Sequence, residues 1–82
     1  ESGPVTFRAK KYLLNDIIYW FGGGVTFFDE TEEEVSVRVR VNYAAMRRWA
    51  LQYALHVRIL SPESLAEQVR EDIRAAGVNY GE

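Results

Sequence analysis

The chain has no cysteine, one histidine and two prolines among its 82 residues. Without cysteine it forms neither a disulfide nor a thiolate nucleophile, and because disulfides mark oxidising compartments we expect a cytoplasmic protein. No apolar run approaches the roughly 20 residues that span a bilayer, and no signal peptide is visible, so we expect no membrane association. The formal net charge of −2 gives no overall attraction to nucleic acid or acidic lipid.

Residues that support catalysis or metal binding are also scarce. His56 has no acidic or serine partner nearby in the sequence, which favours a surface histidine over a general base. No residues have metal-ligand spacing, and the acidic run at 30–34 lacks the Asp/Asn/Gly pattern of a calcium loop. The glycines at 22–24 follow a predicted helix, whereas phosphate loops precede one. The sequence therefore predicts no enzyme, no catalytic residue, no cofactor and no metal site.

The composition suits one small domain, because 48% of the residues are hydrophobic and 13% are aromatic. A domain of this size buries roughly 60–65% of its unfolded surface, so we expect it to fold with a modest margin of stability. Residues 1–4 are expected to be a linker or a remnant of cloning. Residues 5–80 are expected to form the domain, and residues 81–82 a tail.

Hydrophobic spacing predicts the element order β-α-β-β-α-β-α. Alternating apolar residues predict strands at 5–10, 25–29, 35–41 and 56–60. A spacing of three and four predicts helices at 11–21, 43–53 and 62–76. The expected N-caps are Asn42 and Ser61, with Pro62 at the first helical position, and the expected helix ends are Gly22 and Gly77.

This order predicts an α+β, ferredoxin-like βαββαβ sandwich with an added C-terminal helix. Right-handed crossovers place the first and fourth strands together and both helices on one face, which gives a four-stranded antiparallel sheet of order 4-1-3-2. The last helix has a narrow apolar stripe, as expected for a helix docked on an edge. The residues expected to face inward are Val5, Phe7, Val25, Phe27, Val37, Val39, Val57 and Ile59 on the strands, and Leu13, Leu14, Ile17, Ile18, Trp20, Phe21, Ala45, Met46, Trp49, Tyr53, Leu65, Val69 and Ile73 on the helices.

The outer face of the predicted sheet gathers positive charge. Such a patch is typical of a site for nucleic-acid backbone, a phosphorylated ligand or an acidic partner. Alternatively, the basic side chains are ordinary outward residues that pair with the glutamate-rich loop, or the last helix covers part of them. Only Phe28 is aromatic on this face, which favours phosphate binding over base stacking. The candidate anion-binding residues are Arg8, Lys10, Arg38, Arg40 and Arg58.

Tyr12 and Tyr19 are seven residues apart on the first predicted helix, opposite its core stripe. Exposed aromatic residues are typical of protein interfaces because they add contact area and a hydroxyl group. Arg47, Arg48 and Leu51, on the outer side of the second helix, extend the same candidate contact surface. The alternative is partial burial of the tyrosines against a neighbouring loop. The predicted interface residues are Tyr12, Tyr19, Arg47 and Leu51.

Three stretches carry a family likeness. They are Asn-Asp-Ile-Ile-Tyr-Trp-Phe-Gly at 15–22, Met-Arg-Arg-Trp-Ala-Leu-Gln-Tyr at 46–53 and Val-Arg-Ile-Leu-Ser-Pro-Glu-Ser-Leu at 57–65. Together they resemble the C-terminal extension, called WCX, of bacterial WYL-domain transcriptional regulators, over nearly the whole chain. One departure is that Ala54 and Leu55 stand where the second helix of relatives often ends in glycine.

The resemblance implies a regulatory role. In that family, a winged helix-turn-helix is followed by a WYL domain with an Sm-like barrel and then by this ferredoxin-like extension. The extension is thought to aid dimerisation and sensing. The resemblance therefore implies a non-catalytic regulatory and dimerisation domain that helps ligand sensing in transcription regulation. Its implied partners are same-chain WYL and helix-turn-helix domains absent from this sequence, a second copy in a homodimer, and a nucleic-acid or other anionic effector. The alternative is an autonomous nucleic-acid- or phosphate-binding module that uses the basic sheet face.

Overall fold

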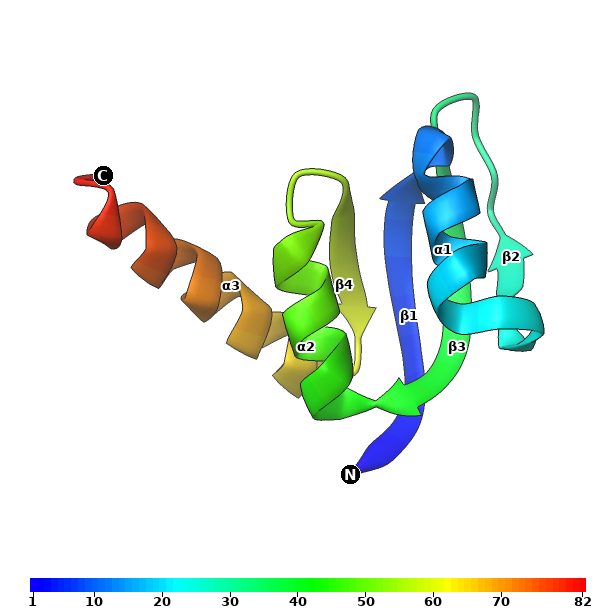
Figure 1. The fold of residues 1–82 in the computed structure, drawn as a ribbon, viewed down its shortest axis with the longest axis horizontal. Helices are drawn as coiled ribbons and strands as arrows, with labels where there is room; N and C mark the ends of the chain where they lie inside the picture. Colours follow the sequence, from blue (N-terminus) through cyan, green and yellow to red (C-terminus); the bar gives the residue numbers. More distant parts are fainter.

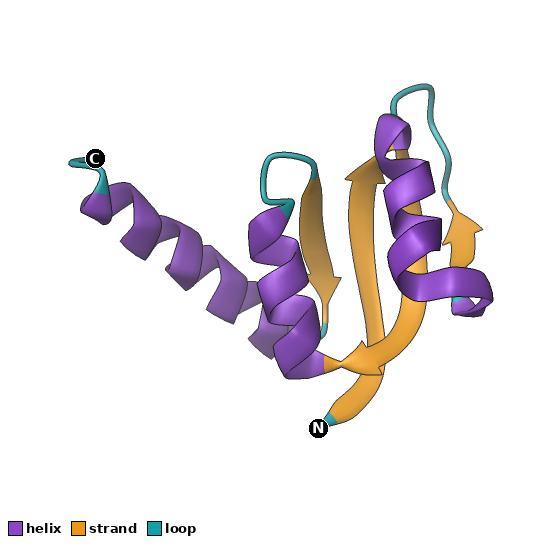
Figure 2. Ribbon diagram, viewed as in Figure 1, coloured by secondary structure: helices purple, strands orange, loops and turns teal.

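The computed structural model describes residues 1–82 and is an α+β fold (Figure 1). Its strands form one antiparallel sheet of order β2-β3-β1-β4, which confirms the predicted order 4-1-3-2. Figure 2 shows α1 and α2 packed on the same side of this sheet. The elements are β1 (Ser2–Lys10), the 3-10 turn η1 (Lys11–Leu13), α1 (Leu14–Phe21), the 3-10 turn η2 (Gly22–Gly24), β2 (Thr26–Phe28), β3 (Glu34–Asn42), α2 (Tyr43–Gln52), β4 (Val57–Ser61) and α3 (Glu63–Asn79).

The central strand β1 begins earlier than its hydrophobic alternation predicted. Residues 2–4, expected to be a linker, pair in register with residues 40–42 of β3. The ring of Tyr43 packs against Gly3 so closely that a Cβ there would lie 2.3 Å from the tyrosine hydroxyl. The Tyr43 backbone N–H also donates to the carbonyl of Glu1 at 2.9 Å. The first residues are therefore part of the sheet, because the start of α2 packs on them.

The core lies between the sheet and the helices, as the alternation predicted. Alternate residues are buried from Gly3 to Ala9 of β1 and from Val35 to Val39 of β3, and Val41 is half-buried. The inward faces of the two longest strands are therefore as expected. Two residues that were expected to be buried are exposed. They are Phe27, on the short edge strand, and Ala45, in the first turn of α2. The buried apolar residues are Val5, Phe7, Ala9, Leu13, Ile17, Val35, Val37, Val39, Met46, Trp49, Ala50, Ile59, Leu65, Ala66 and Val69.

The first helix is divided into η1 and α1, and its buried stripe is narrower than expected. Ile17 is fully buried, whereas Ile18 and Trp20 are each 50% exposed. At 100° per residue these two lie at opposite margins of a stripe centred on Ile17, so only the residues between them face the sheet. Gly22 ends α1 with φ 65° and ψ −148°, a region that is essentially restricted to glycine. The expected glycine cap is confirmed.

The second helix begins and ends with its backbone groups satisfied. The side chain of Asn42 accepts a hydrogen bond from the Ala45 N–H at 2.9 Å, which confirms the predicted N-cap. At the other end, the Tyr53 N–H donates to the Trp49 carbonyl at 3.1 Å, and the His56 N–H donates to the Tyr53 carbonyl at 2.8 Å. This hydrogen-bonded turn explains how the helix ends without glycine.

The last helix has its N-cap one residue later than expected and continues three residues past its expected end at Ala76. Ser61 is not its N-cap, because pairing with Thr6 keeps Ser61 in β4 and moves the cap to Pro62. The Pro62 carbonyl accepts from the N–H groups of residues 65 and 66, both at 3.1 Å. The helix also continues through Gly77 to Asn79, so the expected stop at Gly77 is wrong.

This helix packs against β4 and α2, and its far end projects beyond the sheet (Figure 1). Leu65 and Val69 of its predicted stripe are buried, but Ile73, one turn further along the helix, is 46% exposed. The helix therefore leaves the outer face of the sheet uncovered. No helix of the chain is both long enough and apolar enough to cross a membrane.

Candidate functional site

The face of the sheet opposite the helices carries all five predicted anion-binding residues. They alternate along β1, β3 and β4 with the buried residues, and these three strands are adjacent in the sheet. The register places Arg8 directly opposite Arg58, and Arg38 opposite Thr6. We call this surface the basic face: Arg8, Lys10, Arg38, Arg40 and Arg58, together with the neutral outward residues between them.

Glu34 divides the basic face into two parts. As the first residue of β3 it pairs with Lys10, and its carboxylate lies 3.0 Å from Lys10 Nζ and 3.1 Å from Arg8 Nε. Arg58 is more distant, with Nη1 3.6 Å from the same carboxylate. Hydrogen bonds from Lys10 and then Arg8 lower the pKa of Glu34 below its ordinary value. The alternative that the cations pair with the glutamate-rich segment is thus correct for these three.

The guanidinium of Arg8 is hydrogen-bonded within the domain rather than free to bind a ligand. Its Nη1 donates to the Asp29 carbonyl at 2.6 Å and to the Ser36 hydroxyl at 2.8 Å, in addition to its bond with Glu34. Only 13% of the Arg8 side chain is exposed, and Ser36 is 3% exposed. Arg8 therefore holds the connection between β2 and β3 against the sheet, and its donors are already occupied.

Arg38 and Arg40 form the free part of the basic face. Both are exposed and neither has an acidic partner within 4.0 Å. The guanidinium of Arg38 lies over the ring of Phe28, 4.6 Å from its centroid, so it covers the single aromatic ring of this face. Thr6 and Thr26 flank Arg38 in cross-strand register. This arrangement favours binding of phosphate oxygens over stacking of a base on Phe28.

The two tyrosines of the predicted interface are exposed, so the alternative of partial burial is wrong. Tyr12 is 71% exposed and Tyr19 is 81% exposed. Each has a different neighbour, because Tyr12 lies in the 3-10 turn and Tyr19 in α1. The Tyr12 hydroxyl is 2.8 Å from His56 Nδ1, whereas the Tyr19 ring meets Trp20 edge-on with centroids 5.7 Å apart. The interface itself stays a prediction.

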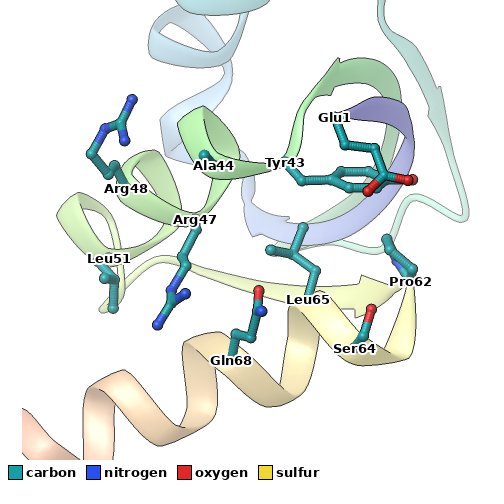
Figure 3. A pocket seen from close by; sticks show the side chains of 10 residues that line it. All are labelled: Glu1, Tyr43, Ala44, Arg47, Arg48, Leu51, Pro62, Ser64, Leu65 and Gln68. Atoms are coloured by element: carbon teal, nitrogen blue, oxygen red, sulfur yellow. The ribbon is translucent and has the colours of Figure 1, made fainter.

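Arg47 and Leu51 lie elsewhere, in a groove between α2 and α3 (Figure 3). Arg47 makes a two-point ion pair with Asp72, with Nε 2.6 Å from Oδ2 and Nη2 2.8 Å from Oδ1. This pair lowers the pKa of Asp72 and joins α2 to α3. Arg47 is therefore committed within the chain, while Figure 3 shows Arg48 pointing away from α3.

Sequence reasoning missed Asp72 and Ser36 as organising residues. It included Glu34 only as one member of the glutamate-rich loop in the alternative interpretation. Only the strand register and the docking of α3 bring them to their arginines. No group of three or more His, Asp or Glu side chains is close enough to hold a metal ion.

The comparisons with known proteins agree with the resemblance. The sequence profile of the WCX domain matches residues 2–77. No curated protein matches the chain significantly. The match covers β1 to the last turns of α3 and so includes the whole sheet and both surfaces described above. The chain belongs to the WCX domain family.

Proposed function

We propose that this domain is a non-catalytic regulatory and assembly domain of a bacterial, cytoplasmic WYL-type helix-turn-helix regulator, where it helps effector sensing and dimerisation. The WCX match over residues 2–77 carries the proposal, because it suggests a regulatory C-terminal domain of WYL-type proteins. The element order and the strand order β2-β3-β1-β4 support a ferredoxin-like assignment. Such a domain acts through its surfaces.

The basic face is the surface that we assign to an anionic effector or to nucleic acid. Support comes from Arg38 and Arg40, whose charges have no acidic partner on an uncovered face. The test is an amide NMR titration of the domain with short single-stranded DNA at low and moderate salt. Shifts that centre on β3 and fade with salt support the proposal. Absence of shifts would show that the isolated domain has no affinity of its own for DNA, which leaves assembly through the exposed tyrosines as the better account.

Two double variants with the same change in charge distinguish binding at the basic face from nonspecific attraction of DNA to positive charge. The double variant Arg38→Gln and Arg40→Gln removes two positive charges from the basic face. The control Arg70→Gln and Arg74→Gln removes the same charge from α3, where both arginines pair with glutamates of their own helix. We expect the first variant to lose DNA binding and the control to keep it. Equal loss in both would indicate nonspecific attraction.

We propose that the exposed tyrosines of η1 and α1, Tyr12 and Tyr19, form part of the dimer interface. The double variant Tyr12→Ala and Tyr19→Ala should weaken the dimer of the intact regulator, since exposed aromatic rings supply contact area at interfaces. Tyr80→Ala is the control, because Tyr80 is equally exposed but lies past the end of α3. An undiminished dimer in sedimentation velocity would refute the assignment.

The second candidate function is an autonomous nucleic-acid- or phosphate-binding module. The free Arg38 and Arg40 favour it because they need no other domain to be available. If these two arginines each neutralise one phosphate of a single strand, log K should fall with log salt at a slope of about −1.4. Binding by the isolated domain with this slope supports autonomy. Binding that appears only in the intact regulator supports the first function.

A further inference from the structure

A second groove, apart from the basic face, lies between α1 and α2 on the helix-covered side. Its volume is about 480 Å³, within the range of ligand sites in proteins. Most of its lining is apolar, and its two polar members, Arg48 and Gln52, are both exposed. The lining residues are Trp20, Phe21, Val41, Ala45, Met46, Arg48, Trp49 and Gln52.

Hydrogen bonds and ring packing hold the aromatic walls of this groove in place. The Trp20 indole N–H donates to the Tyr53 hydroxyl at 3.2 Å, and that hydroxyl donates to Asp16 Oδ2 at 3.1 Å. This chain of bonds joins α1 to the end of α2. Trp49 packs between the rings of Phe21 and Tyr53, each with a centroid distance of 4.9 Å. The half-exposed Trp20 is therefore an oriented wall rather than a free surface side chain.

Trp49 carries an unused hydrogen-bond donor. The side chain is only 6% exposed, and its Nε1 is buried with no acceptor. Buried donors are nearly always paired, because losing water without gaining a partner is costly. The other indole, Trp20, has its partner in Tyr53. Less than 1 Å² of this nitrogen is accessible, so a ligand in the groove does not reach the donor, and Trp49 serves the groove as an apolar wall.

The rim of the groove is positively charged. Arg48 has no acidic partner and points away from α3 (Figure 3). Gln52 follows it by four residues, so the guanidinium and the amide lie on one side of α2. A guanidinium presents paired donors that match a planar carboxylate. The rim is therefore complementary to an anion at the end of an apolar body.

We propose that the groove between α1 and α2 binds a small aromatic carboxylate. The ring packs against the exposed side of Trp20, and the carboxylate pairs with Arg48 and Gln52. This site is separate from the basic face and goes beyond the proposed function. The groove proposal can therefore be wrong while the proposed function is right, and the reverse also holds.

The experiment is an NMR titration of the domain with 4-hydroxybenzoate, read on the two indole N–H signals and on the backbone amides. A ligand of about ten heavy atoms should bind with a Kd of roughly 10 µM to 5 mM. We expect the Trp20 indole signal to move, because the ring of the ligand packs against it. The neutral 4-hydroxybenzamide should bind at least about tenfold more weakly, because a charge-assisted bond is lost.

Arg48→Gln should weaken 4-hydroxybenzoate binding about tenfold. Arg40→Gln, which removes the same charge from the basic face, should leave the Kd unchanged. Three outcomes would overturn the proposal: no shift at about 10 mM ligand, about twice the upper end of the expected Kd range; equal binding by Arg48→Gln; or shifts that centre on Arg38 and Arg40.

Discussion

Glu34 is expected to limit anion binding by the basic face, and Glu34→Gln tests this directly. The carboxylate of Glu34 lies within 4.0 Å of Arg8, Lys10 and Arg58, so it neutralises part of the surface that a phosphate would approach. Glutamine keeps the size, but it replaces one of the two acceptor oxygens with an amide donor and removes the charge. The variant should therefore bind single-stranded DNA more tightly than the unmodified domain.

The size of the effect follows from which cations are released. Arg8 stays bound to Ser36 and the Asp29 carbonyl, so it contributes no new phosphate contact. Lys10 and Arg58 have no other carboxylate partner and become available. Together with Arg38 and Arg40 they raise the number of neutralised phosphates from two to four. The salt slope for a single strand should then steepen from about −1.4 to about −2.8.

The assay is fluorescence anisotropy of a labelled oligothymidine at several salt concentrations. Glu33→Gln is the control, because it makes the same charge change in the neighbouring loop at a residue with no ion pair. An unchanged slope and Kd in Glu34→Gln would refute the idea that Glu34 restrains the basic face. An equal gain in DNA affinity in Glu33→Gln would show that the effect comes from the change in net charge alone.

Three further predictions concern the stability of the fold. Asn42→Ala removes the α2 cap bond and should cost about 1 kcal/mol, with Tm lower by roughly 4–8 °C in circular dichroism; an unchanged Tm would contradict the cap. Gly22→Ala forces alanine into a glycine-only region and should cost about 1–3 kcal/mol in urea unfolding, whereas Gly23→Ala, at ordinary φ, should cost less. The pKa of Asp72 is lowered, so its contribution to stability is complete above its unfolded pKa of about 4 and is lost as pH falls through the lower folded pKa. Asp72→Asn should flatten the pH dependence of unfolding below about pH 4, and an unchanged pH profile would show that the Arg47 pair does not stabilise the fold.

Local pattern alone determined the elements and their faces. The alternation of valines from 35 to 41 requires one buried face, because side chains of a strand point to opposite sides in turn. The cap at Asn42 and the end at Gly22 follow from short-range chemistry that needs no other part of the chain. The element order then leaves few sheet topologies, and the predicted one is present.

The tertiary structure decided which charges are free. Five cations on one face could be read from the strands, but the register that sets Glu34 opposite Lys10 could not. Register depends on how two distant strands pack on both faces, and a long strand leaves several pairings open to pattern alone. The docking of α3 likewise decided that Arg47 meets Asp72.

The same division applies to the helix side. Sequence spacing put Trp20 and Trp49 on inward faces, and it could not distinguish a core residue from one that lines a groove. That difference depends on how far apart α1 and α2 pack, which the Trp20–Tyr53–Asp16 hydrogen bonds help to set. Periodicity therefore determined what each element shows to the core, and long-range packing determined which side chains remain available to a partner.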